Sequence, residues 1–99
     1  MKLTAKVQVK NAMGLHTRPA TEIVKLLQRF KSKVSLTYKK DTINARSILG
    51  ILMLAACQNS RITIAIEGED AEETMQALVE AFEKGFGTEY GDRHESFAR

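Results

Sequence analysis

The chain has 99 residues, of which 43% are hydrophobic and 27% charged, a composition typical of one globular domain. This length excludes a second domain of ordinary size, and no apolar run approaches the roughly 20 residues that a membrane-spanning helix requires. The net charge of +3 is unevenly placed: residues 1–40 contain ten basic residues and one acidic residue, whereas residues 41–99 contain five and eleven. A basic first half favours acidic partner surfaces or phosphate groups.

The first ten residues alternate in polarity and do not resemble a signal peptide. Cys57 is the only cysteine and follows an apolar run, so we expect a buried thiol in a reducing compartment. Together with His16 and His94 it provides too few soft ligands for a zinc site, and neither a metal nor a cofactor is expected. These features predict a cytoplasmic protein without membrane insertion.

Residues 2–10 alternate apolar and polar side chains, the period of a strand with one buried face. A loop over residues 11–15 follows, in which Gly14 permits backbone angles that other residues avoid. Apolar residues at helical spacing then predict an amphipathic helix over about residues 17–29. Pro19 suits the first turn of this helix, where an N–H would have no intrahelical partner.

His16 is expected at or beside the cap of that helix. The N–H groups of a first turn and the positive end of the helix dipole favour anions, and Arg18 adds a fork of donors matched to phosphate oxygens. The cationic form of a histidine is disfavoured there, so its neutral ring can attack phosphorus. A histidine used only for capping or packing is the alternative, and the neighbouring Gly14, Arg18 and Pro19 weigh against it.

Residues 33–38 alternate as a second strand, and a turn at residues 39–41 leads to a short third strand over residues 42–45. No residue of this turn is an obvious source of a positive φ, which weakens the prediction of a hairpin.

Ser47 is a preferred N-cap for an apolar helix over about residues 48–56. Its two apolar stripes consist of Ile48, Leu52 and Ala55, and of Leu49 and Met53. Such a helix is either enclosed or presents an exposed patch that binds partners. Ile51 and Leu54 are expected in the core.

A turn at Asn59, which tolerates a left-handed conformation, precedes a fourth strand in which isoleucines alternate over residues 62–66. Asp70 with Glu73 resembles a capping box at the start of a last helix, and Gly85 is a natural stop. The expected buried stripe of this helix is Ala71, Met75, Leu78, Val79 and Phe82.

The resulting order is β-α-β-β-α-β-α, which favours an α+β sandwich with helices backing one face of four strands. Periodicity alone is equally compatible with a ferredoxin-like plait. We expect one domain over residues 1–86 and a flexible tail over residues 87–99, in which His94 is solvated.

Residues 14–20, Gly-Leu-His-Thr-Arg-Pro-Ala, closely resemble the active-site signature of the HPr family, the histidine-containing phosphocarriers of the bacterial phosphotransferase system. A second block over residues 45–54 resembles the family's signature around its regulatory serine. The resemblance runs from about Lys2 to Phe86. It implies the open-faced HPr fold, a four-stranded antiparallel sheet with three helices on one face.

The resemblance implies that His16 accepts a phosphoryl group, on Nδ1 in the family, from phosphorylated Enzyme I and passes it to IIA proteins or domains. Arg18 would stabilise the phosphate, the N–H groups of Thr17 and Arg18 would contribute, and Pro19 would fix the helix start. The chain contains no GxxxxGK loop, so the phosphoryl group must come from another protein. The protein would be a monomeric phosphocarrier, a covalent intermediate and not an enzyme.

Ser47 occupies the family's regulated position, where a phosphate would gain from the helix N-terminus and from the neighbouring Arg46. The resemblance therefore implies an HPr kinase/phosphorylase and a transcription regulator as further partners, while a serine that only caps a helix is the simpler alternative. The residues that match Ile48, Leu49 and Leu52 belong to the family's docking surface beside the histidine.

Two questions of function stay open at this point. Residues 11–14, 52–54 and 82–87 resemble the nitrogen-regulatory branch of the family, with its relative NPr, whereas residues 47–50 resemble HPr proteins controlled at serine. A purely regulatory role is equally compatible. A small basic module that binds RNA or protein without phosphotransfer is the rival from another class. Nucleic acid is disfavoured, because Tyr38 is the only base-stacking candidate on the early strands.

Overall fold

The structure, a computed structural model, describes residues 1–87; apart from Gly87, the predicted tail lies outside the described residues. One antiparallel sheet has the strand order β1-β4-β2-β3. Its strands are β1 (Lys2–Gln8), β2 (Lys33–Tyr38), β3 (Asp41–Asn44) and β4 (Arg61–Glu67). The helices are α1 (Thr17–Leu27), α2 (Ile48–Met53) and α3 (Ala71–Glu83), followed by a single 3₁₀ turn, η1 (Gly85–Gly87).

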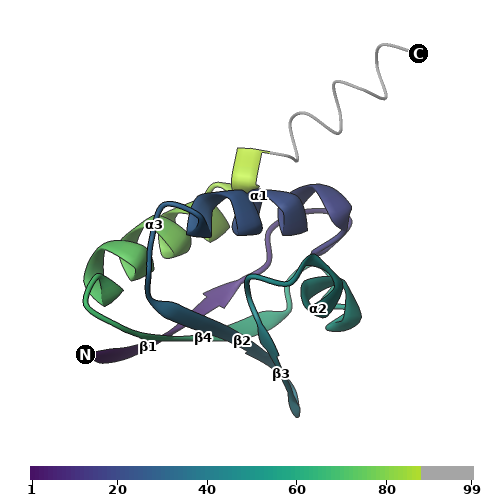
Figure 1. Ribbon diagram of the computed structural model, residues 1–99. Helices are drawn as coiled ribbons and strands as arrows, with labels where there is room; N and C mark the ends of the chain where they lie inside the picture. Colours follow the sequence, from purple (N-terminus) through teal and green to yellow (C-terminus); the bar gives the residue numbers. More distant parts are fainter. Residues whose placement is uncertain (88–99) are drawn as a thin grey trace.

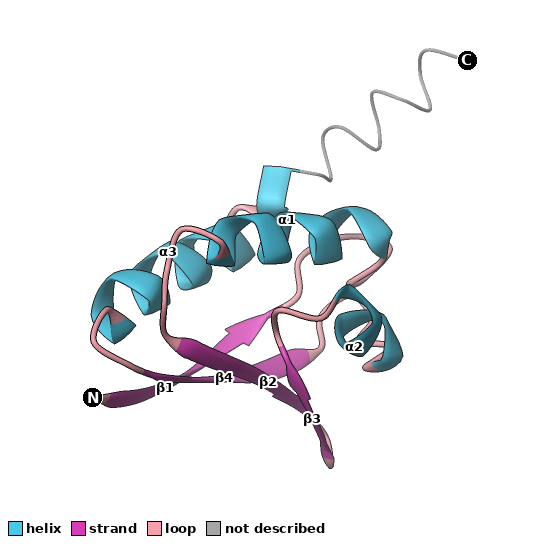
Figure 2. Ribbon diagram, in the orientation of Figure 1, coloured by secondary structure: helices cyan, strands magenta, loops and turns pink. Residues whose placement is uncertain are grey.

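Helices α1 and α3 lie side by side over one face of the sheet, and α2 packs against α1 and β3 (Figures 1 and 2). The predicted element order and the open-faced sandwich are thereby confirmed. The ferredoxin-like alternative is excluded, since the two central strands here are β4 and β2, which pair antiparallel, whereas the central strands of that plait are its first and third and run parallel.

Alternating side chains of the central strands build the core between the sheet and the helices. Ile64 and Ile66 of β4 stand opposite Leu36 and Val34 of β2, and all four face the helices. The fully buried large apolar side chains are Phe82, Ile23, Leu27, Leu36, Ile51, Ile62, Ile64, Ile66, Leu78 and Val9. The predicted stripe of α3 is buried at Ala71, Leu78 and Phe82 and partly buried at Met75 and Val79.

Two helices end earlier than the sequence predicted. Helix α1 ends at Leu27, because the amides of Arg29 and Phe30 donate to carbonyls three residues back, at 3.2 and 3.1 Å, and tighten the last turn. Helix α2 ends at Met53, because Ala55 adopts a φ of +52°, a left-handed conformation that stops a helix.

The predicted β2–β3 hairpin is present, and its turn obtains a positive φ from Lys39, at +57°, which the sequence did not single out. The Lys39 ammonium lies 5.3 Å from the centre of the Tyr38 ring, a cation–π contact that offsets part of the backbone strain. With the turn closed at this position, β3 begins at Asp41 and ends at Asn44, one residue earlier than predicted at each end.

Arg46 joins the end of α1 to the loop that precedes α2. Its Nη1 donates to the Leu27 carbonyl at 2.8 Å, and its Nη2 donates to the carbonyls of Phe30 and Ser32, both at 2.9 Å. The bond to Leu27 is favourable because a carbonyl at a helix C-terminus carries partial negative charge, and the other two bonds satisfy carbonyls of the loop after α1. The prediction that Arg46 assists a phosphate at Ser47 is therefore corrected, since its guanidinium is directed to main-chain carbonyls.

Asp70 is the N-cap residue of α3, but the predicted capping box with Glu73 is wrong. Its carboxylate makes no bond to the amides of α3 and instead accepts from the amides of Lys31 and Ser32, at 2.8 and 3.0 Å, and from the Ser32 hydroxyl. These bonds, that of the Ser32 hydroxyl foremost, lower the pKa of Asp70 from 3.8 to about 2. The ionised carboxylate thus ties the α1–β2 loop to the start of α3.

Because the pKa of Asp70 is lowered in the folded protein, its stabilisation is fully present above pH 3.8 and is lost as the pH falls through about 2. We expect Asp70→Asn to lower the midpoint temperature of unfolding at neutral pH. Between pH 3.8 and about 2, the midpoint temperature of this variant should fall less steeply than that of the wild type. Glu69→Gln removes an exposed neighbouring carboxylate and is the control that keeps the decline. Thermal unfolding followed by circular dichroism from pH 1.5 to 7 measures both; parallel curves for Asp70→Asn and the wild type would contradict the assignment.

Candidate functional site

His16 is the N-cap residue of α1, as the sequence predicted. Its backbone is extended, with φ −81° and ψ −168°, and its carbonyl accepts from the Ala20 amide at 3.0 Å, which closes the first helical turn. The imidazole makes no capping bond to the helix. The ring is therefore held at the start of the helix without being used as its cap.

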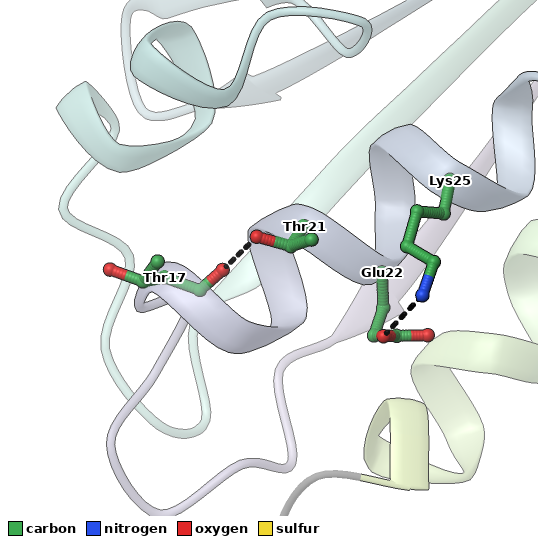
Figure 3. Close-up of polar contacts among 4 residues, drawn as sticks. All are labelled: Thr17, Thr21, Glu22 and Lys25. Atoms are coloured by element: carbon green, nitrogen blue, oxygen red, sulfur yellow. Dashed lines mark hydrogen bonds and ion pairs between the residues drawn. The ribbon is translucent and has the colours of Figure 1, made fainter.

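The first turn of α1 contains no acidic side chain. The one acid of the basic half, Glu22, pairs with Lys25 at 3.8 Å further along the helix, and the Thr21 hydroxyl donates to the Thr17 carbonyl at 2.8 Å (Figure 3). Arg18 extends from this first turn and is partly buried. The N-terminal end of α1 consequently keeps its positive character, which favours a bound anion beside His16.

Gly14 brings the loop before His16 into direct contact with the segment that follows α2. Its φ is +71°, and a Cβ at this position would lie 2.3 Å from the Ala56 carbonyl oxygen and 2.9 Å from Cys57 Cα. The Leu15 amide donates to the same Ala56 oxygen at 2.9 Å. Only glycine allows this approach, so the position of His16 is set by the segment after α2.

Two further contacts hold the same loop. The buried Asn11 donates from Nδ2 to the Gly85 carbonyl at 2.8 Å, which joins the loop to the end of α3. Val9 exchanges main-chain hydrogen bonds with Asn59 and Ser60 at 2.7 and 2.9 Å, and Asn59 has the predicted left-handed conformation, with a φ of +73°. The loop that carries His16 is thus anchored at both of its sides.

A surface depression beside His16 brings three segments of the chain together. It is lined by Ala12, Met13, Leu15, His16, Leu52, Ala55, Ala56, Cys57 and Gln58. The Nε2 atom of His16 is buried, although the residue as a whole is partly exposed. Cys57 is exposed, so the prediction of a buried thiol is wrong. Because α2 ends at Met53, Cys57 lies in the loop after the helix and not on a buried helical face.

Helix α2 divides its apolar residues between the core and the surface. Ile51 and Leu54 are buried, as predicted. The outward residues of the helix and Met13, which lines the same depression as Leu52, form a surface that we call the apolar patch. Its members are Met13, Ile48, Leu49, Leu52 and Met53. Leu49 is 67% exposed and Met53 71%. An exposed patch of this kind is typical of a surface that binds a partner.

The sequence did not assign Met13 or Met53 to this surface. Met13 lies in a loop, where periodicity carries no information about exposure, and Met53 belongs to a stripe that could have faced the core. The usable signal was that α2 has more apolar residues than one buried face can hold.

Ser47 is the N-cap of α2, and its Oγ accepts from the Gly50 amide at 3.0 Å. The residue is exposed and directly precedes Ile48 at the edge of the apolar patch. Ser47 therefore caps the helix and is also accessible from solvent.

Within residues 1–87, no three His, Cys, Asp or Glu side chains are arranged to hold a metal ion. In the same part of the chain, no helix is both long and apolar enough to cross a bilayer.

Comparison with known proteins places this geometry in a family. Residues 3–84 match the family model described as PTS HPr component phosphorylation site. The chain is 44% identical over 85 residues to the phosphocarrier protein HPr of Chlamydia trachomatis, covering 86% of this chain and 78% of the relative. It is 40% identical over 84 residues to the HPr of Xylella fastidiosa, covering 85% and 94%.

Solved structures agree with these sequence matches. The crystal structure of HPr-C-His from Thermoanaerobacter tengcongensis superposes with a TM-score of 0.82 and 35% identity, covering 86% of this chain and 96% of that one. The HPr of Bacillus anthracis has a TM-score of 0.78 and 40% identity, covering 82% and 96%.

The contact of Gly14 with Ala56 predicts a specific sensitivity. Gly14→Ala should destabilise the protein by about 2 to 5 kcal/mol, because it adds a clash to the strain of a positive φ. Gly87→Ala is the matched control: its φ is also +71°, but among residues 1–87 no atom beyond its chain neighbour lies within 4 Å of the added Cβ, so only about 1 to 2 kcal/mol is expected. Urea unfolding measures both free energies, and equal values would show that the approach to Ala56 does not constrain the loop.

Proposed function

The chain belongs to the HPr family, the phosphocarriers of the phosphotransferase system, and we propose that its His16 accepts a phosphoryl group from phosphorylated Enzyme I and passes it to IIA proteins or domains. The observation that carries this proposal is the position of His16 as the N-cap of a helix whose first turn has no acidic residue. The protein acts as a monomeric covalent intermediate and not as an enzyme.

His16 attacks phosphorus through Nδ1, and the burial of Nε2 supports this choice. As the new N–P bond forms, the bond between phosphorus and the donor breaks, and the electron pair leaves with the donor. The phosphoryl oxygens then lie at the N-terminal end of α1. The amide groups of Thr17 and Arg18 and the Arg18 guanidinium stabilise their charge, while Pro19 keeps the first turn in place.

Donor and acceptors dock on the apolar patch, including Ile48, Leu49 and Leu52. The patch is exposed and shares a depression with His16 through Leu52. Docking there buries apolar side chains next to the ring that accepts the phosphoryl group. The basic first half of the chain adds long-range attraction for acidic partner surfaces.

Ser47 is a regulatory phosphorylation site for an HPr kinase/phosphorylase, and its phosphorylated form is the one a transcription regulator binds. The exposure of Ser47 and its position directly before Ile48, at the edge of the apolar patch, support this role. A phosphate there would add nearly two negative charges beside Ile48. Regulation follows from repulsion of an acidic partner and from desolvation of the phosphate at the docking surface.

The phosphocarrier role is tested by incubation with Enzyme I and phosphoenolpyruvate, followed by intact mass. We expect one phosphate, labile in acid and stable in base as a phosphoramidate is, and none on His16→Ala. His94→Ala removes the other histidine of the chain and should be labelled normally. Labelling of His16→Ala at the wild-type level would contradict the assignment.

The regulatory role of Ser47 is tested with two variants that separate charge from capping. Ser47→Asp keeps an N-cap acceptor and adds a negative charge, whereas Ser47→Ala removes the cap at a cost of about 1 kcal/mol and adds no charge. We expect Ser47→Asp, and not Ser47→Ala, to accept phosphate from Enzyme I more slowly. Two results together would show that Ser47 only caps the helix. Ser47→Asp would accept phosphate from Enzyme I at the wild-type rate, and an HPr kinase with ATP would leave Ser47 unmodified.

A further inference from the structure

The most exposed large apolar side chains of residues 1–87 are two methionines of the apolar patch. Met13 is 70% exposed and Met53 is 71% exposed. Met13 precedes Gly14 in the loop before His16 and lines the depression that contains His16 and Leu52. Met53 ends α2 four residues after Leu49, so the two side chains share the outward side of that helix.

We propose that Met13 and Met53 are oxidation sites, through which a peroxide reversibly weakens docking of the phosphoryl donor; this inference rests on the proposed function. The thioether sulfur attacks one peroxide oxygen, the O–O bond breaks, and that oxygen remains on sulfur as a sulfoxide. Methionine loses two electrons, and hydrogen peroxide is reduced to water. Methionine sulfoxide reductases reverse the change.

Oxidation changes the docking surface and leaves the reacting group intact. A sulfoxide replaces a flexible apolar side chain with a polar, chiral one, and here it does so at two places on the same patch. The remaining members of the patch, Ile48, Leu49 and Leu52, have no oxidisable atom. His16 and Arg18 keep their structure and charge, so the chemistry of transfer is preserved.

Methionine also suits what this surface has to do. A phosphocarrier docks a donor and then one or more acceptors on the same residues, and the unbranched methionine side chain adapts to surfaces of different shape. The same exposed sulfur that allows this adaptation is open to a peroxide. Sensitivity to oxidation thus follows from the chemistry of an adaptable docking surface.

The chain supplies its own controls. Met1 is 65% exposed, but it precedes β1, at the opposite end of that strand from the loop that carries Met13 and His16 (Figure 1). It should be oxidised as readily as the two patch methionines without affecting docking. Met75 of α3 is partly buried against the core and should react more slowly.

The expected effect is on docking and not on the chemical step. With this protein as the substrate of Enzyme I, oxidation of both patch methionines should raise the KM of Enzyme I for it by about threefold to tenfold, as expected when apolar contacts with the donor are lost. The kcat should be unchanged, because no group that touches the phosphoryl group is altered. A loss of kcat at constant KM would overturn the proposal.

The experiment uses the full chain in a Cys57→Ser background, so that oxidation of the exposed thiol cannot account for the result. The protein is treated with hydrogen peroxide, freed of it, and mapped by peptide mass. Phosphate transfer from Enzyme I is then measured before and after treatment. Absence of transfer before treatment would overturn the proposed function; normal transfer before treatment isolates the test of the oxidation sites.

Three outcomes are expected together. The KM of Enzyme I for the wild type rises when sulfoxides form at Met13 and Met53. The KM for the Met13→Leu/Met53→Leu variant is the same before and after treatment. Met1→Leu does not prevent the rise in KM. Methionine sulfoxide reductase restores the KM of the treated protein without any substitution. An unchanged KM with both sulfoxides verified by mass, or an equal rise in the double leucine variant, would overturn the proposal.

Discussion

The backbone of Gly14 and Leu15 runs against the Ala56 carbonyl, and the geometry of the whole site depends on this approach. The segment that contains Ala56 continues from α2, so the exposed apolar residues of that helix and the loop that leads to His16 are joined at this contact. A side chain at Gly14 would separate them. Close packing of these two main-chain segments thus determines how far the His16 ring lies from the apolar patch.

The first turns of the two long helices differ in their charge. Helix α3 has Glu72 and Glu73 in its first turn, so its own carboxylates balance the positive end of its dipole. Helix α1 has no acid in its first turn and begins with His16 as its N-cap. The positive dipole end of α3 is therefore balanced by acidic residues of its own first turn, whereas that of α1 is not, which is why the proposed phosphoryl site is placed at the start of α1.

Helix α2 divides six residues between the core and the exposed apolar patch. Ile51 anchors it in the core, while Leu49 and Met53 project to solvent. Arg46 holds the loop before it against the end of α1, and Ser47 caps its first turn. These bonds position an apolar surface that would otherwise favour burial, and they leave the exposed hydroxyl of Ser47 at its edge.

Local chemistry in the sequence was sufficient for the elements and for the reactive ring. Period-two alternation identified the strands, Pro19 marked the start of α1, and the family signature pointed to His16, whose capping position the structure confirms. The isoleucines of β4 and the stop at Gly85 followed from the same rules, because each depends only on residues nearby in the chain.

Tertiary structure decided the features that depend on distant partners. Asp70 could have accepted from its own helix, but packing offered it the amides of Lys31 and Ser32. Arg46 could have faced a phosphate at the neighbouring Ser47, but the last residue of α1 and the loop after it present three carbonyls to its guanidinium. Cys57 is exposed because α2 stops early. In each case several partners are compatible with the local sequence, and only the arrangement of elements far apart in the chain determines which of them lies within reach.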